Sequence, residues 1–269
     1  MIQVAVNGAA GRMGRELVIA CQRNEALKLA AAFEAPGSDA VGQDAGRLAT
    51  GEDLDIVIAS ADKRGQAVFD VLVDFTRPEP CLAAVDDCVA QGAAIVIGTT
   101  GFDADQLARI EAASQQIAVV MAPNFSAGVN LTLKLLEMAA KALGDSVDIE
   151  VIEAHHRHKV DAPSGTALRI GEVLADATGR DLDDCAVYAR HGHTGERERQ
   201  TIGFQTIRGG DIVGEHTVLF AGDGERLEIS HKASSRQTFA GGAMRAAAWA
   251  AEKPAGRYDM NDVLGLATE

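Results

Sequence analysis

The segment EAHHRHKVDAPSGTA, residues 153–167, concentrates titratable and cationic side chains in one short stretch. Three histidines, one arginine and one lysine occupy residues 155–159, and a Pro-Ser-Gly-Thr turn follows. Such a cluster can be a metal site, an anion pocket, a proton donor or an ordinary solvated loop. Histidine titrates near neutral pH and suits proton donation, whereas lysine and arginine suit carboxylate binding.

The overall composition limits which partners this cluster can serve. The chain has 269 residues, 47% of them hydrophobic and 24% charged, which is a globular composition with room for two modest domains. Its formal net charge of −14 argues against nucleic acid or an anionic membrane surface as the main partner. A basic cluster in an acidic chain therefore favours a local pocket over part of a broad basic surface, and a few exposed basic residues on a loop are the alternative.

The N-terminus and the cysteines indicate a cytoplasmic protein. MIQVAVNGAAG lacks the basic residues and apolar core of a secretory signal, and no run of about 18 apolar residues predicts a membrane span. Cys21, Cys81, Cys88 and Cys185 show no C-x-x-C spacing. We interpret them as reduced structural thiols.

Two H-x-H pairs raise the alternative of a metal site. His156 and His158 form one pair, and His191 and His193 form the other. Catalytic zinc usually takes three protein ligands, and no H-E-x-x-H motif or cysteine pair supplies the third. We therefore expect no bound metal.

A glycine-rich segment near the N-terminus predicts a dinucleotide site. NGAAGRMG places Gly8, Gly11 and Gly14 between an expected strand and an expected helix. Glycines there let the backbone approach a pyrophosphate, which binds to N–H groups at the helix start. The G-x-x-G-x-x-G spacing departs from the usual G-x-G-x-x-G and is weak evidence alone. Glu34 strengthens it, because an acid about 20 residues after the last glycine reaches the ribose hydroxyls.

Alternating strand and helix signals predict a parallel sheet in the first half of the chain. Strands are expected at 2–6, 27–33, 71–75, 93–98 and 117–123, and helices at 12–24, 78–91 and 103–114. GTTG at 98–101 and APNFSAG at 122–128 follow later strands. They therefore fall at the sheet edge where ligands of such folds bind.

The pattern changes after residue 125. A helix is expected at 130–143, a strand at 146–154, a helix at 166–177, then three segments that alternate like antiparallel strands, and a helix at 239–251. We predict an α/β fold with two domains. The first is a Rossmann-like, parallel-sheet dinucleotide-binding domain at 1–126, on which 239–269 packs back, and the second is an α+β domain with a mixed sheet at 127–238.

Several segments together resemble one enzyme family. EVIEAHHRHKVDAPSGTA closely resembles the signature segment of the dihydrodipicolinate reductases, which act in bacterial and plant lysine biosynthesis. NGAAGRMGR, VDFTRPE, VIGTTGF, APNFSAGVN and SSRQTFAGGA resemble other segments of that family in the same order. The resemblance implies NAD(P)H-dependent reduction of 4-hydroxy-tetrahydrodipicolinate to tetrahydrodipicolinate. It also implies a cytoplasmic homotetramer, with substrate binding and oligomerisation in the second domain.

The resemblance assigns roles to individual residues. His155 matches the family's proton donor, and Lys159 matches its second catalytic residue. The implied substrate contacts are His156, Lys159, Gly165, Thr166 and Arg236. The implied cofactor contacts are Gly8, Ala9, Ala10, Gly11, Arg12, Met13, Glu34, Gly98, Thr99, Thr100, Ala122, Pro123, Asn124 and Phe125. Spacing alone does not separate His155 from His156 or His158 as proton donor.

The chemistry of the implied substrate explains the basic cluster. That substrate is a six-membered ring with two carboxylates, so Lys159 can pair with one of them. Gly165 and Thr166 can offer N–H groups at the start of the following helix. Hydride addition to the conjugated C=C–C=N system places negative charge on a neighbouring atom, which a histidine can protonate.

Two alternatives come from other functional classes. A non-catalytic NAD-binding sensor would keep the glycine segment and Glu34 but would not need the donor cluster. Another two-domain Rossmann oxidoreductase, such as a semialdehyde dehydrogenase, needs an activated cysteine. None of the four cysteines follows a strand in a glycine-flanked motif, which argues against that class.

The residues after Glu34 predict a preference between cofactors. Many members of the resembled family have an arginine there, which can neutralise the 2′-phosphate of NADPH. Here the stretch is FEAPG, so Ala35 and Pro36 follow the acid. We predict NADH as the preferred cofactor with NADPH possible, since Arg12, Lys63 or Arg64 could supply a cation from elsewhere.

Overall fold

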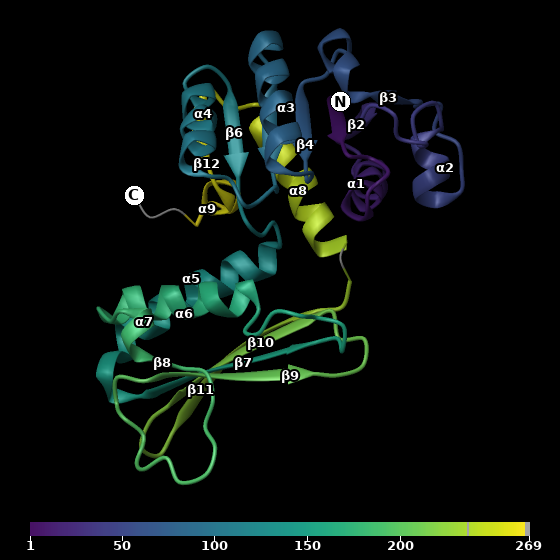
Figure 1. Cartoon of the computed structure of the whole chain (residues 1–269). Helices are drawn as coiled ribbons and strands as arrows, with labels where there is room; N and C mark the ends of the chain where they lie inside the picture. The colour runs from purple at the N-terminus through teal and green to yellow at the C-terminus, as the bar shows by residue number, and fades with distance from the viewer. Residues whose placement is uncertain (236, 267–269) are drawn as a thin grey trace. The chain divides into compact units, whose positions relative to one another are not determined.

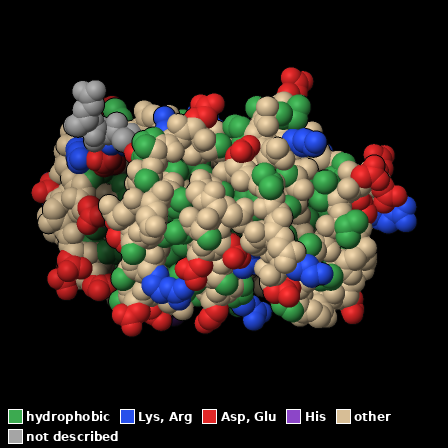
Figure 2. Space-filling view, turned by 90° about the horizontal axis from the view of Figure 1, so that it is seen from above, with side chains coloured by type: hydrophobic (Ala, Val, Ile, Leu, Met, Phe, Trp, Pro, Cys, Tyr) green, Lys and Arg blue, Asp and Glu red, His purple; other side chains and the backbone are tan. Residues whose placement is uncertain are grey.

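The computed structural model describes residues 1–235 and 237–266. The chain divides into two compact units, Met1–Ala127 with Gln237–Glu269, and Gly128–Arg236. The bounds expected from sequence, 1–126 with 239–269 and 127–238, differ slightly from these. On the face that Figure 2 displays, acidic side chains are scattered and no broad basic area gathers.

The first unit is built on a parallel sheet of seven strands. Their order is β12-β6-β5-β4-β1-β2-β3, and each neighbouring pair runs parallel. The predicted Rossmann-like parallel sheet is therefore confirmed. The strands are β1 (Ile2–Asn7), β2 (Leu27–Glu34), β3 (Ile58–Ser60), β4 (Val71–Asp74), β5 (Ala94–Ile97), β6 (Ala118–Met121) and β12 (Gly256–Tyr258).

Helices cover both faces of this sheet (Figure 1). Alternate strand residues form two apolar layers, one packed on α1 and α8 and the other on α3 and α4. The helices of this unit are α1 (Arg12–Gln22), α2 (Ala45–Thr50), α3 (Pro78–Gln91), α4 (Ala104–Ser114), α8 (Gln237–Ala250) and α9 (Met260–Leu264), with the 3₁₀ helix η1 at Ala61–Gln66. Helix α8 comes from the C-terminal part of the chain and packs in this core.

Local sequence signals explain where these helices begin and end. Pro78 is in the first turn of α3, and Gly92 ends the helix with a positive φ of 69°. At α4, Asp103 and Gln106 form a capping box that satisfies N–H groups at the helix start. Such signals made these two helices predictable.

The second unit is a mixed sheet with helices on one face (Figure 1). The strand order is β11-β10-β7-β9-β8. Apolar residues of the sheet pack against α5 and α6. The elements are α5 (Ala127–Leu143), the 3₁₀ helix η2 (Gly144–Ser146), β7 (Asp148–His155), α6 (Gly165–Thr178), α7 (Leu182–Cys185), β8 (Ala186–Val187), β9 (Ile202–Arg208), β10 (Gly214–Ala221) and β11 (Arg226–Ala233).

The mixed sheet is confirmed, but one detail of the sequence interpretation is wrong. Strands β10 and β11 are antiparallel neighbours as expected, and β10 also runs antiparallel to β7. Strand β9 instead lies parallel to β7, from Ile149↔Ile202 to His155↔Arg208. The alternating pattern of β9 identifies a strand but not its direction, because both pairings expose alternate residues.

Candidate active site

The carboxyl ends of the central parallel strands meet at one edge of the first sheet. Asn7 at the end of β1 is level with Phe33 of β2 and with Asp74 of β4. Asp74 is in turn level with Ile97 of β5, and Ile97 with Met121 of β6. The segments predicted to bind the cofactor follow these residues, so the fold brings them to the same edge.

The turn after β1 and the first turn of α1 each require a glycine. Gly8 has a φ of 72°, and a Cβ on it would lie 2.7 Å from Cγ2 of Thr76. A Cβ on Gly14 would clash with the carbonyl oxygen of Gly8. The turn therefore keeps its backbone uncovered where α1 begins. Gly11 caps α1 without a side-chain hydrogen bond, which leaves N–H groups of the first turn for an anion.

Glu34 closes the other side of this turn. Its Oε1 accepts a hydrogen bond from the Ala10 N–H at 3.0 Å, and its Oε2 accepts one from the Ala35 N–H at 3.0 Å. The carboxylate is therefore fixed beside the glycine turn. This arrangement fits a dinucleotide. The pyrophosphate can approach the glycine backbone at the start of α1, and the Glu34 carboxylate can accept hydrogen bonds from the ribose hydroxyls.

A buried polar network beneath the turn was missed by the sequence interpretation. Asp74 is fully buried and accepts hydrogen bonds from Asn7 Nδ2 at 2.6 Å and from Thr99 Oγ1 at 2.7 Å. Arg64, 4% exposed, donates to Asn7 Oδ1 at 3.2 Å and to Asp87 at 2.9 Å. These bonds tie together the ends of three strands. They also engage Arg64, which the sequence left open as a cation for NADPH.

The remaining predicted cofactor residues lie on loops of this sheet edge but differ in accessibility. Arg12 is exposed, whereas Ala9, Thr99, Ala122 and Phe125 are buried. The Phe125 ring packs on Phe75 with 5.4 Å between ring centroids. Those four buried residues can therefore offer a ligand mainly their backbone groups. Met13, Gly98, Thr100, Pro123 and Asn124 also belong to these loops or to the first turn of α1.

In the second unit, His155 ends strand β7 in a buried hydrogen-bonded position. Its Nδ1 lies 2.6 Å from Oε2 of Glu153, two residues earlier on the same face. Burial lowers the pKa of His155, and the bond to Glu153 opposes that shift without cancelling it. Burial also raises the pKa of Glu153, but hydrogen bonds from Arg208 and His155 outweigh it and hold the pKa below its ordinary value.

Lys159 follows on the loop after β7 and is paired in this structure with Asp161. Its Nζ lies 2.9 Å from Oδ2 of Asp161, and this bond lowers the pKa of the Asp161 carboxyl. The Asp161 side chain is 54% exposed, so water competes for it and the ion pair contributes little to stability. A substrate carboxylate can therefore take the place of Asp161 at small cost.

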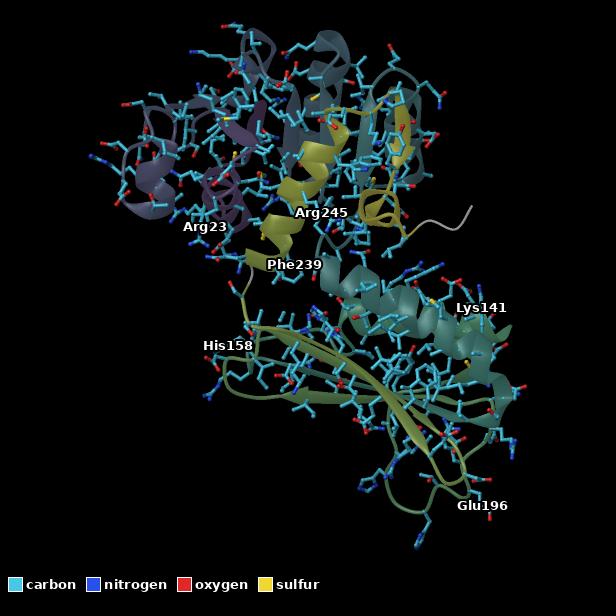
Figure 3. All side chains as sticks on the ribbon, turned by 180° about the vertical axis from the view of Figure 1, so that it is seen from behind. Arg23, Lys141, His158, Glu196, Phe239 and Arg245 are labelled. Atoms are coloured by element: carbon cyan, nitrogen blue, oxygen red, sulfur yellow. The ribbon has the colours of Figure 1, made fainter. Side chains whose placement is uncertain are left out.

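The other two histidines of the cluster have different surroundings. His156 Nδ1 is buried and has no hydrogen-bond partner among the described residues. His158 is exposed on the loop, where Figure 3 labels it. Their ring centroids are 6.2 Å apart.

The Pro-Ser-Gly-Thr turn forms the beginning of α6. The Ser164 hydroxyl caps the helix by accepting a hydrogen bond from the Ala167 N–H at 3.1 Å. Gly165 and Thr166 are in the first turn, where N–H groups have no acceptor within the helix. Ser164 Oγ also lies 2.9 Å from Nε2 of His216, a buried residue of β10. His216 is 52 positions from Ser164, so sequence spacing gave no signal for it.

The predicted substrate contact Arg236 lies outside the residues that the structure describes. Within residues 1–235 and 237–266, no three His, Cys, Asp or Glu side chains group as metal ligands. No helix in those ranges has the length and apolar character of a membrane span.

The cysteines do not have the surroundings of an activated nucleophile. Burial raises the pKa of Cys21 to about 12, and burial also raises the pKa values of Cys81 and Cys88. The pKa of Cys185 is raised in the same direction. Thiols with raised pKa values are poor nucleophiles, which disfavours the semialdehyde dehydrogenase alternative.

The glycine turn and Glu34 at the edge of a parallel sheet define a class of protein, the oxidoreductases with a Rossmann-like domain for a pyridine nucleotide. Family comparison then gives the particular member of this class. The N-terminal model of dihydrodipicolinate reductase matches residues 2–125, and the C-terminal model matches residues 128–264. The chain belongs to the dihydrodipicolinate reductase family, and it is an NAD(P)H-dependent oxidoreductase of diaminopimelate and lysine biosynthesis.

Individual relatives agree with this assignment. A protein of Alkalilimnicola ehrlichii named 4-hydroxy-tetrahydrodipicolinate reductase is 60% identical over 272 residues, covering 98% of this chain and 99% of the relative. The dipicolinate-bound dihydrodipicolinate reductase of Paenisporosarcina sp. TG-14 superposes with a TM-score of 0.75 at 25% identity, covering 96% of this chain and 97% of that one. A probable dehydrogenase of Thermotoga maritima, 8% identical with a TM-score of 0.60 and covering 98% and 93% of the two chains, shares the fold alone.

Proposed function

We propose that this protein reduces 4-hydroxy-tetrahydrodipicolinate to tetrahydrodipicolinate, with NADH as its preferred cofactor, His155 as proton donor and Lys159 as second catalytic residue. The observation that carries this assignment is the buried His155–Glu153 pair at the end of β7. Of the three histidines in the cluster, His155 is the one whose Nδ1 bonds to a buried carboxylate. That bond leaves Nε2 as the nitrogen that can carry a proton to a ligand.

The first unit would hold the cofactor at the turn after β1. The bare backbone of Gly8–Met13 and the start of α1 suit the pyrophosphate, and Glu34 suits free ribose hydroxyls. Gly98–Thr100 and Ala122–Phe125 line the same sheet edge and belong to the proposed site. When bound, the reduced nicotinamide supplies the hydride.

The second unit would bind the dicarboxylate substrate. Lys159 exchanges its bond to Asp161 for one substrate carboxylate, and the N–H groups of Gly165 and Thr166 bind a carboxylate at the start of α6. His156 is proposed as a further contact; its Nδ1 has no hydrogen-bond partner among the described residues. Arg236 is proposed as a contact from the sequence resemblance alone.

His155 then protonates the atom that becomes negative when hydride adds to the conjugated system. Its burial favours the neutral form, so a nearby substrate dianion helps to keep the donor charged. Lys159 lies close enough to lower the pKa of His155. When Lys159 pairs with a substrate carboxylate, its positive charge lowers the pKa of His155 less. Lys159 therefore has an electrostatic role as well as a binding role.

Assembly as a homotetramer through the second sheet is part of the same proposal. Helices α5 and α6 cover one face of that sheet, and the other face presents Ile152, Ile207 and Leu219, with Ile207 50% exposed. Apolar residues on an uncovered sheet face suit pairing with another copy. Sedimentation of wild type and Ile207→Lys tests this, and an unchanged tetramer in the variant would count against this face. The free thiols support a cytoplasmic location.

A coupled assay tests the proposed activity. Pyruvate and aspartate semialdehyde are condensed enzymatically, and oxidation of NADH or NADPH is followed after the protein is added. The expected result is oxidation that depends on the condensation product, with higher kcat/KM for NADH. If NADH binds but is not oxidised, the protein is a nucleotide-binding sensor instead.

A further inference from the structure

Glu153 holds a central position that the sequence interpretation did not identify. It lies on β7, level with Thr206 of β9 and His216 of β10, and its side chain is 1% exposed. A carboxylate is costly to bury unless cations and hydrogen-bond donors surround it. The hydrogen-bond partners of the Glu153 carboxylate therefore indicate its role.

Each oxygen of the Glu153 carboxylate accepts at least two hydrogen bonds. Oε2 accepts from His155 Nδ1 at 2.6 Å and from Arg208 Nη1 at 2.8 Å. Oε1 accepts from Arg208 Nη2 at 2.8 Å and from the Ser164 N–H at 3.1 Å. Arg208 thus neutralises the charge through two parallel bonds. The remaining bonds come from His155, from the Ser164 N–H in the turn that begins α6, and from Thr206 Oγ1, which lies 3.4 Å from Oε1.

We propose that Glu153 is a positioning residue for the reduction, which orients the proton donor His155 and at the same time fixes the carboxylate-binding turn at Ser164. This proposal rests on the proposed function, since it needs His155 as the proton donor. The bond at Nδ1 fixes the ring plane and directs Nε2 away from Glu153. The bond at Ser164 holds the residue directly before Gly165 and Thr166.

The neighbouring strand β10 has a glycine beside His155 Nε2. A Cβ on Gly214 would lie 3.1 Å from this nitrogen, so any larger residue there would crowd it. One ring nitrogen is therefore bound by Glu153, and the other faces a position without a side chain. This is the arrangement expected of an oriented histidine acid.

Glu153→Gln tests the proposal by removing the negative charge while keeping the size of the side chain. The charged or titratable groups near His155 are Glu153 on β7, Lys159 on the loop, Arg208 on β9 and His216 on β10. Of these groups, Glu153 is the one that raises the pKa of His155 and so favours its protonated form. In the variant, kcat is expected to fall roughly 10- to 100-fold, a usual cost of losing a partner that orients a histidine. The alkaline limb of kcat/KM is expected at lower pH, because His155 loses its proton more easily.

Glu150→Gln is the matched control. Glu150 is on the same strand and accepts two bonds from Arg190, at 2.8 and 2.7 Å, but it bonds to neither His155 nor Ser164. The expected kcat and pH profile of this variant are those of wild type, after sedimentation confirms an unchanged assembly. Glu153→Asp is the second variant, in case Glu153→Gln does not fold. It keeps a charge beside Arg208 but draws it back from His155, so a smaller change in the same direction is expected.

Titration of the His155 ring by NMR supplies the readout that a purely structural role would not change. A His155 pKa lower in Glu153→Gln or Glu153→Asp than in wild type, together with the lost turnover, supports the proposal. Wild-type turnover in a folded variant overturns it, and so does lost turnover with an unchanged His155 titration and pH profile. Full activity of His155→Ala would instead overturn the proposed proton donor, which keeps the two failures distinct.

Discussion

The Glu34 carboxylate accepts a hydrogen bond from the Ala10 N–H at 3.0 Å, so the acid at the end of β2 is fixed against the glycine turn after β1. A carboxylate at this place accepts bonds from free ribose hydroxyls and repels a 2′-phosphate. Arg64, one of the cations that could have offset this repulsion, is buried in bonds to Asp87 and Asn7. We therefore expect a higher kcat/KM with NADH than with NADPH.

Ala35→Arg tests the origin of this preference. A guanidinium directly after Glu34 is expected to raise kcat/KM for NADPH relative to NADH, because it can pair with the 2′-phosphate. Ala35→Gln is the control, since it adds length without charge and should leave the ratio near that of wild type. Equal or better use of NADPH by wild type would contradict the prediction, as would an unmoved ratio in Ala35→Arg.

Gly165→Ala probes the start of α6. A Cβ on Gly165 meets nothing within 4 Å, so alanine should fold with an unchanged melting temperature. The added methyl group would stand beside the N–H groups proposed to bind a carboxylate. The expected result is a higher KM for the dicarboxylate and an unchanged KM for NADH. If neither KM changes, the substrate does not approach this turn.

Asp74→Asn tests the buried network at the carboxyl edge of the first sheet. The amide would place a donor against Asn7 Nδ2, from which the wild-type carboxylate accepts a bond at 2.6 Å. Loss of one buried acceptor is expected to lower the free energy of unfolding by about 2 to 3 kcal/mol and to weaken NADH binding. Asp70→Asn is the control, because the Asp70 side chain is exposed and accepts a bond from the Gln3 N–H at the surface. Similar stability of both variants in urea would contradict the expectation.

The lowered pKa of His216 predicts how the free energy of unfolding depends on pH. Burial and the nearby His155 lower the pKa of His216 from 6.5 to about 4, so the folded protein keeps this ring neutral where the unfolded chain protonates it. The unfolded chain therefore binds more protons between pH 6.5 and 4, and the contribution of His216 is lost as pH falls through this window. His155 and His231, whose pKa values burial also lowers, act in the same direction.

His216→Gln separates His216 from these other groups, since glutamine can still bond to Ser164 but does not titrate. The free energy of unfolding should fall less steeply from pH 6.5 to 5 in the variant than in wild type. This range lies above the region where most carboxylates titrate. Equal slopes for the two proteins would mean that His216 is not the group responsible.

The sequence predicted those parts of the fold that local signals specify. Alternating apolar strands and capped helices identified the main elements of the first unit, and helix α3 begins and ends at Pro78 and Gln91 as expected. The short edge strands β3 and β12 were missed, since three residues give too little periodicity. The parallel direction of β9 was missed because one strand's pattern does not reveal its partner.

In the candidate site too, local sequence signals predicted some features and missed those that depend on tertiary structure. Glu34 and His155 are the last residues of β2 and β7, close to where the sequence placed the ends of these strands, so their approximate places could be predicted. The partners that orient them depend on tertiary structure. Arg208 reaches Glu153 across 55 positions, and Arg64 reaches Asn7 across 57. No local pattern encodes such pairs, because only the register of the sheet and the path of the loops bring them together.

The most direct test of the central claim is the turnover of His155→Ala with NADH and the enzymatically formed condensation product, measured beside the affinity of the variant for NADH. A general acid typically contributes about 10² to 10⁴ in rate, so kcat is expected to fall by that factor. NADH binding should remain close to that of wild type, because the residues proposed to bind the cofactor belong to the other unit. Lys159→Met should show the same separation. Near-wild-type turnover of a folded His155→Ala would contradict the account.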